Sequence, residues 1–238
     1  MLAAKGSTTS AVIIPAKDEE TTIGGVLDAV LPHLECGLLD ELIVVDDGSS
    51  DATAEVAARP GVTVLRRREG GGKGAAMSAG FEASSAELLL FLDGDVENTT
   101  EHFVPRMLGP LLLDPEIMLV KAFYDRPFGD QPTGGGRVTE LTARPALAVL
   151  FPELASLRQP LAGETATRRI VLEKVGLEDG YRVEMGLLID VALQWGETSI
   201  AEVDLGIRIH RNRPLGDLAP MAREILAVAL ERAAGAQL

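Results

Sequence analysis

Short apolar runs alternate with helix-like segments through the first hundred residues, and this alternation constrains the fold more than any other feature. The runs at 11–14, 41–45, 62–65 and 87–92 are rich in Val, Ile and Leu and have the length of buried strands. Segments of helical periodicity lie between them. Strands separated by helices pair in parallel through right-handed crossovers. The chain is therefore predicted to be an α/β protein with a mostly parallel central sheet.

The second half of the chain is less regular. We expect helices at about 101–113, 137–150, 184–195 and 218–233, and strands at about 117–122 and 199–209. No internal repeat, linker or low-complexity stretch separates the two halves. One domain spanning residues 1–238, with two functional halves, is therefore predicted.

Charge and composition exclude several classes of partner. A formal net charge of -14 disfavours nucleic acid and anionic membranes. The single Cys36 excludes an intrachain disulfide framework and is typical of a reducing compartment. The first ten residues lack the apolar segment of a signal peptide, and no stretch reaches the roughly 20 apolar residues that span a bilayer. We expect a soluble, cytoplasmic protein with neither nucleic-acid nor membrane partners.

The fourth apolar run ends at Asp93-Gly94-Asp95, which is a candidate metal site. Two carboxylates around a glycine offer hard oxygen ligands to Mg²⁺ or Mn²⁺ on a tight turn. A metal there would hold a diphosphate and neutralise its charge. An acidic turn without any ligand explains the same residues, so the motif alone decides nothing.

Other polar motifs follow the first three apolar runs, where ligands of parallel sheets bind. The motifs at 15–20 and 46–51 offer carboxylates and backbone groups to a nucleobase or ribose, although a helix N-terminus and a turn explain them equally. Lys73 lies in a Gly-rich turn that opens a helix and favours anions, without the P-loop pattern. The candidate nucleotide-binding residues are Pro15, Ala16, Lys17, Asp18, Glu19, Asp47, Ser49, Lys73 and Asp93.

Taken together, these motifs resemble a known family. V-I-I-P-A-x-x-E-E, V-V-D-D-G-S-S-D-x-T, G-K-G-A-A and L-D-G-D are similar to the first half of GT-A glycosyltransferases. In the second half, the segments 135–140, 163–164, 180–186 and 203–212 resemble the glucosyl-3-phosphoglycerate synthase family. The resemblance extends from residue 11 to about 225. The chain departs from the family pattern at Lys17-Asp18, at Val96 and in being short at both ends.

The resemblance implies a fold, a reaction and an assembly. The fold would be the GT-A Rossmann-like nucleotide-sugar-binding fold, with a donor half at about 10–122 and an acceptor-binding half with the C-terminal helix at about 123–238. The reaction would transfer glucose from UDP-glucose to 3-phosphoglycerate with retention of configuration, using Mg²⁺ or Mn²⁺. The protein would be a homodimer.

The resemblance also implies roles for individual residues. His210 would join Asp95 as a metal ligand, although a lone His is more often structural. Glu184 would hold a sugar hydroxyl, although an acid at a helix N-terminus explains it equally. The implied catalytic residues are Glu184, Asp95 and Arg208, and the implied acceptor-binding residues are Gly136, Arg137, Val138, Thr139, Tyr181 and Asn212.

Three other functions remain open at this point. A related transferase would use GDP-mannose, another small acidic acceptor or a substrate of specialised metabolism. A nucleotidyltransferase acting on a sugar phosphate would have a Gly-rich, basic first loop, where this chain has Pro15-Ala16-Lys17-Asp18-Glu19. A regulator that binds a sugar nucleotide without turnover would keep the binding motifs alone.

Overall fold

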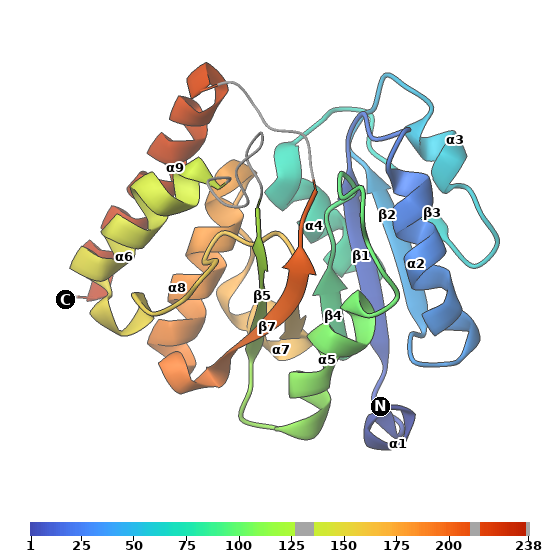
Figure 1. Cartoon of the computed structure of the whole chain (residues 1–238), viewed down its shortest axis with the longest axis horizontal. Coiled ribbons are helices and arrows are strands. Elements are labelled where there is room, and N and C mark those ends of the chain that lie inside the picture. Colours follow the sequence, from blue (N-terminus) through green and yellow to red (C-terminus); the bar gives the residue numbers. More distant parts are fainter. Residues whose placement is uncertain (127–135, 210–214, 237–238) are drawn as a thin grey trace.

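A single twisted sheet forms the centre of the molecule (Figure 1). The structure is a computed structural model that describes residues 1–126, 136–209 and 215–236. Within them, the strand order is β3-β2-β1-β4-β6-β5-β7. The strands are β1 (Ser10–Ala16), β2 (Glu41–Asp46), β3 (Thr63–Arg66), β4 (Leu88–Phe91), β5 (Leu119–Asp125), β6 (Thr165–Arg168) and β7 (Ile200–Ile207). Only β6 is antiparallel to its neighbours, so the predicted mostly parallel α/β sheet is confirmed.

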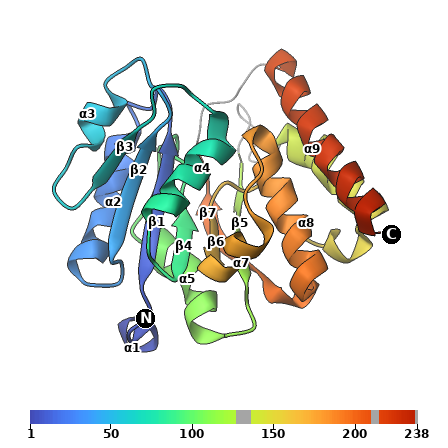
Figure 2. The same cartoon turned by 180° about the vertical axis from the view of Figure 1, so that it is seen from behind.

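Helices cover both faces of this sheet, as Figures 1 and 2 show from opposite sides. Helices α2, α3 and α5 lie on one face, and α4, α7 and α8 lie on the other, with α6 and α9 packed outside them. The helices are α1 (Leu2–Lys5), α2 (Ile23–Glu35), α3 (Thr53–Ala57), α4 (Gly72–Ala83), α5 (Phe103–Leu113), α6 (Arg144–Leu150), α7 (Arg169–Val175), α8 (Val183–Trp195) and α9 (Leu215–Ala236). In the described residues, no helix is both long enough and apolar enough to cross a membrane.

Strand β1 shows why the first apolar runs become central strands. Ala11 and Ile13 pack into the core on one face, and Val12 and Ile14 pack into the core on the other. All four side chains are fully buried. Because successive side chains of a strand point to opposite faces, a strand covered on both sides needs a continuous apolar run.

The second half differs from its prediction in two places. Strand β6 and helix α7 were not predicted, and the predicted helix at 137–150 begins as a π-helical turn over Thr139–Ala143 before α6. Arg168 and Arg169, at the junction of β6 and α7, donate to backbone carbonyls of the 111–117 and 81–86 segments. Their guanidinium groups therefore hold neighbouring elements together.

Candidate active site

The carboxyl ends of β1, β2 and β4 open into a cavity of about 660 Å³. Segments 136–139 and 180–184 and helix α9 form its other side. The predicted residues that line it are Pro15, Ala16, Lys17, Asp18, Glu19, Asp47, Lys73, Asp93, Asp95, Gly136, Arg137, Val138, Thr139, Tyr181, Glu184 and Arg208. Ser49 is not among the lining residues, and His210 and Asn212 lie outside the described residues. The cavity thus brings the strand-end motifs of the first half together with the glycine-rich motif of the second.

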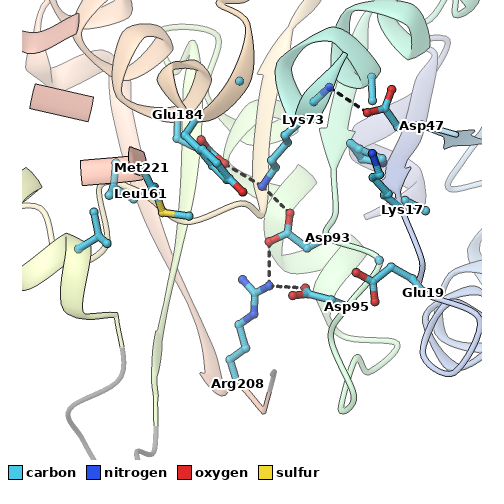
Figure 3. Close-up of a pocket in the computed structure, with 18 of the residues that line it drawn as sticks. Lys17, Glu19, Asp47, Lys73, Asp93, Asp95, Leu161, Glu184, Arg208 and Met221 are labelled. Atoms are coloured by element: carbon cyan, nitrogen blue, oxygen red, sulfur yellow. Dashed lines mark hydrogen bonds and ion pairs between the residues drawn. The ribbon is translucent and has the colours of Figure 1, made fainter. Parts of the chain in front are cut away.

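A network of opposite charges occupies the centre of the cavity (Figure 3). Lys73 Nζ lies 2.5 Å from Asp93 Oδ1 and 2.7 Å from Glu184 Oε1. Arg208 Nη2 lies 2.7 Å from Asp93 Oδ2 and 2.9 Å from Asp95 Oδ1. Both oxygens of Asp93 are therefore engaged, whereas Asp95 has one contact to Arg208 and its side chain is 36% exposed.

The opposite charges keep Asp93 and Lys73 ionised. Burial alone would raise the pKa of Asp93, but the charges of Lys73 and Arg208 outweigh burial and hold that pKa well below its usual value. Burial would lower the pKa of Lys73, but Asp93 and Glu184 raise it instead. Fixed charges of this kind stabilise charge that develops on a bound ligand.

Two buried side chains, Glu164 and Tyr124, hold Arg208 in place. The sequence motifs predicted no role for either. Arg208 Nη1 lies 3.0 Å from Glu164 Oε1 and donates to the Tyr124 hydroxyl at 2.7 Å. Gly163, beside Glu164, has no room for a side chain, because a Cβ there would lie 2.1 Å from Asp93 Oδ2. The Gly163-Glu164 motif therefore leaves room for the acid pair, Asp93 and Asp95, and fixes Arg208.

Two predicted nucleotide-binding residues hold loops together. Asp47 is buried, and its carboxylate accepts the backbone N–H groups of Gly71 and Gly72 at 3.1 and 2.9 Å, at the start of α4. That contact fixes the turn that presents Lys73. The Ser49 hydroxyl accepts the backbone N–H of Asp18 at 3.0 Å, which ties the loop after β1 to the loop after β2. The structure thus places Asp47 in the cavity wall and leaves Ser49 outside the lining.

Comparisons with known proteins agree with this architecture. Residues 11–155 match the family model described as "Glycosyl transferase family 2". The glucosyl-3-phosphoglycerate synthase of Mycolicibacterium paratuberculosis is 46% identical over 97% of this chain and 74% of its own length. The chain belongs to the glucosyl-3-phosphoglycerate synthase family. The member of that family from Petrotoga mobilis is 44% identical over 92% of this chain and 71% of its own length.

Solved structures of this family share the fold. The glucosyl-3-phosphoglycerate synthase from Mycobacterium tuberculosis in complex with Mn²⁺, UDP-glucose and phosphoglyceric acid has a TM-score of 0.90 at 44% identity, covering 98% of this chain and 82% of that one. A structure of the same enzyme with Mg²⁺ and UDP also has a TM-score of 0.90. The GT-A fold implied by the sequence is therefore confirmed.

The donor set of the cavity fits the divalent metal that accompanies UDP in those family structures. The described residues contain no cluster of three or more His, Cys, Asp or Glu side chains that could hold a metal alone. Asp95 supplies a hard, partly exposed carboxylate in the cavity. Both carboxylate oxygens of Asp93, in contrast, already pair with Lys73 and Arg208. Of the acid pair, Asp95 is therefore the residue that fits a metal-binding role.

Proposed function

We propose that this chain transfers glucose from UDP-glucose to 3-phosphoglycerate in a metal-dependent reaction that retains the anomeric configuration. One observation carries the proposal: a single cavity joins the strand-end motifs of residues 15–95 to the 136–139 and 180–184 segments. The family member from Mycobacterium tuberculosis, solved with UDP-glucose and phosphoglyceric acid, supports the assignment at a TM-score of 0.90. Residues 10–122 would then form the donor half, and residues 123–238 the acceptor half.

The donor would bind along the ends of β1, β2 and β4. The segment Pro15–Glu19 and Asp47 would hold uridine, and Lys73 would face the diphosphate from the N-terminus of α4. Asp95, with His210 as its predicted second ligand, would hold Mg²⁺ or Mn²⁺. When bound, the metal supplies positive charge that balances the leaving diphosphate.

The acceptor would bind on the opposite side of the cavity, against Gly136, Arg137, Val138, Thr139, Tyr181 and Asn212. Its hydroxyl oxygen would form a bond to the anomeric carbon on the face from which the diphosphate departs. The bond between that carbon and the β-phosphate oxygen breaks, and the departing phosphate takes the hydroxyl proton. Glu184, beside Lys73 in the cavity, would hold a sugar hydroxyl, and Arg208 would face the diphosphate.

A substrate panel tests this function. Release of nucleotide is measured with UDP-glucose or GDP-mannose as donor, with 3-phosphoglycerate or glycerate as acceptor, and with Mg²⁺, Mn²⁺ or EDTA. We expect turnover with UDP-glucose and 3-phosphoglycerate in either metal and none in EDTA. Faster turnover with GDP-mannose would indicate the related transferase, and metal-dependent UDP binding without transfer would indicate a regulator. Pyrophosphate release from UTP and a sugar phosphate would indicate a nucleotidyltransferase.

We also propose a homodimer acting in the cytoplasm. On α9, Ile225, Val228 and Ala229 pack into the chain's own core, whereas Leu226 remains exposed. Val149 on the neighbouring α6 is 78% exposed, so apolar side chains remain for a second subunit on these helices. Cys36 is exposed and forms no disulfide, which fits a reducing compartment. Light scattering on the purified protein tests the dimer, and a monomer at micromolar concentration would contradict it.

A further inference from the structure

Arg126 lines the cavity immediately after β5, and no motif assigned it a role. Its Nη2 donates to the Tyr124 hydroxyl at 2.7 Å, and its guanidinium carbon lies 4.9 Å from the centre of that ring. Its Nε is buried without a hydrogen-bond partner, and no carboxylate in the described part of the chain pairs with it. Arg126 is thus an oriented cation without an acidic partner among the described residues.

Tyr124 orients Arg126 without neutralising it. The same phenol oxygen accepts hydrogen bonds from Arg126 and from Arg208, each at 2.7 Å. Burial raises the pKa of Tyr124, so the phenol stays protonated and neutral near pH 7. The positive charge of Arg208 is shared among Glu164, Asp93 and Asp95, whereas Arg126, as far as the described residues go, has the neutral phenol as its only hydrogen-bond partner.

The guanidinium of Arg126 faces a space left by a glycine. Gly136 has a φ of 73°, and a Cβ on it would lie 3.5 Å from Arg126 Nη1 and 3.8 Å from Thr139 Oγ1. A guanidinium and a hydroxyl therefore converge on one volume that no side chain of Gly136 fills. Planar donors beside a hydroxyl suit a carboxylate or a phosphate, which accepts from both.

We propose that Arg126 is a substrate-binding residue that holds an anionic group of the acceptor. The inference rests on the proposed function for the identity of that acceptor. Tyr124 and Arg208 separate Arg126 from Asp93 and Asp95, so the residues that would hold the donor diphosphate and its metal lie on the other side of this pair. Arg126 selects the acceptor by charge and leaves donor binding to Lys73 and Asp95.

Calorimetric binding of 3-phosphoglycerate to the full chain tests the proposal. R126Q is expected to weaken binding about 10- to 100-fold, because it removes charge-assisted hydrogen bonds, and R126K is expected to recover part of the loss. Arg158 offers a matched control, because its guanidinium also stacks on an aromatic side chain of β5, 4.1 Å from the Phe123 ring centre, but it does not line the cavity. R158Q is expected to bind like the wild type, and all three variants are expected to bind UDP with Mg²⁺ as the wild type does.

A second ligand shows which anionic group Arg126 holds. Glycerol 3-phosphate lacks the carboxylate, so a loss of affinity for both ligands in R126Q assigns Arg126 to the phosphate. A loss for 3-phosphoglycerate alone assigns it to the carboxylate. Unchanged affinity for 3-phosphoglycerate in R126Q, or an equal loss of UDP affinity, would overturn the proposal.

The two proposals fail in different ways. If the wild type does not bind 3-phosphoglycerate, the proposed function is wrong. The variants are then compared with inorganic phosphate as the probe in place of 3-phosphoglycerate. Weaker phosphate binding in R126Q than in R158Q then supports an anion site at Arg126, and equal binding overturns it. Circular dichroism of each variant confirms that the fold is intact.

Discussion

The two sides of the cavity balance charge differently. On the proposed donor side, Asp93 and Asp95 already pair with Lys73 and Arg208. On the proposed acceptor side, Arg126 donates to a neutral phenol and forms no ion pair with a carboxylate among the described residues. The first side is a network of paired positive and negative side chains. The second side carries a positive charge that no carboxylate among the described residues balances.

Under the proposed function, this difference explains how one acidic chain would bind two anionic substrates. The formal net charge of -14 repels anions at long range, so each substrate needs local positive charge. The proposed donor would bring its charge together with a metal and meet a balanced network. The acceptor brings no cation, so the protein must supply one. The predictions that follow change one side and leave the other intact.

Replacement of Asp95 by Asn should have the largest effect. Asp95 is the partly exposed carboxylate of the acid pair, and D95N removes the charge that would hold the metal. We expect kcat/KM to fall by about 10³-fold, as when one group that stabilises transition-state charge is removed. Initial rates with UDP-glucose, 3-phosphoglycerate and Mg²⁺ measure it. Glu97 also lines the cavity, so E97Q is the control, and near wild-type activity of D95N would contradict the assignment.

The variant G163A should disturb the donor side without removing any charge. The added Cβ would lie 2.1 Å from Asp93 Oδ2, so the carboxylate must leave Lys73 and Arg208. We expect activity to fall by about 10²-fold, because small displacements of catalytic groups cost about that much. The control is G25A on α2, where nothing lies within 4 Å of the new Cβ. Equal activities of the two variants would show that the position of Asp93 is unimportant.

The variant E164Q tests whether the buried ion pair between Glu164 and Arg208 stabilises the fold. Glu164 is 1% exposed and pairs with Arg208, which is 4% exposed, so the change removes the most deeply buried of the three carboxylates that compensate Arg208. We expect the free energy of unfolding in urea to fall by about 3 kcal/mol. Glu55 and Arg66 form an exposed pair, and E55Q should change stability little. A loss in E164Q no larger than that in E55Q would rule out a supporting role for this pair.

Replacement of Lys121 should have the smallest effect, a change in the free energy of unfolding that depends on pH. The side chain is 1% exposed, and its Nζ donates to the carbonyl of Ala162 and the hydroxyl of Thr165, on either side of the Gly163-Glu164 motif. Burial lowers its pKa to about 8. Between that value and the unfolded value of about 10.4, the unfolded chain binds more protons, so stability rises with pH in this window.

The variant K121M should remove this pH dependence. We expect the free energy of unfolding of the wild type, relative to K121M, to rise on the order of 1–2 kcal/mol between pH 7 and 9.5. Urea unfolding of both proteins across that range measures the difference. A difference that is constant with pH would mean that Lys121 titrates at its ordinary value.

The sequence predicts the two halves of the fold unequally for a physical reason. β1 is apolar on both faces, so its run is visible in the sequence. β6 is also buried, but two of its buried side chains are the polar Thr165 and Thr167, whose hydroxyls donate to the carbonyls of Ala162 and Met118. A strand whose buried side chains are polar shows no apolar run.

The site also contains residues that local motifs predict and residues whose contacts depend on the order of the strands in the sheet. The strand-end residues could be predicted because parallel strands bring their carboxyl ends to one edge of the sheet. The contacts among Tyr124, Glu164 and Arg208 depend on β6 lying between β4 and β5, with β7 beyond. No local pattern encodes that order. The support beneath the acid pair therefore became visible only in the structure.

A single proton NMR time course tests the central claim, that one cavity joins a metal-dependent UDP-glucose site to a site for an anionic acceptor. The mixture contains the chain, UDP-glucose, 3-phosphoglycerate and Mg²⁺, with EDTA or omission of the acceptor as controls. The account predicts that the anomeric signal of UDP-glucose is replaced by one α-glucoside signal while UDP appears in equal amount, only in the complete mixture. A β-glucoside, free glucose as the main product, or equal turnover in EDTA would contradict it.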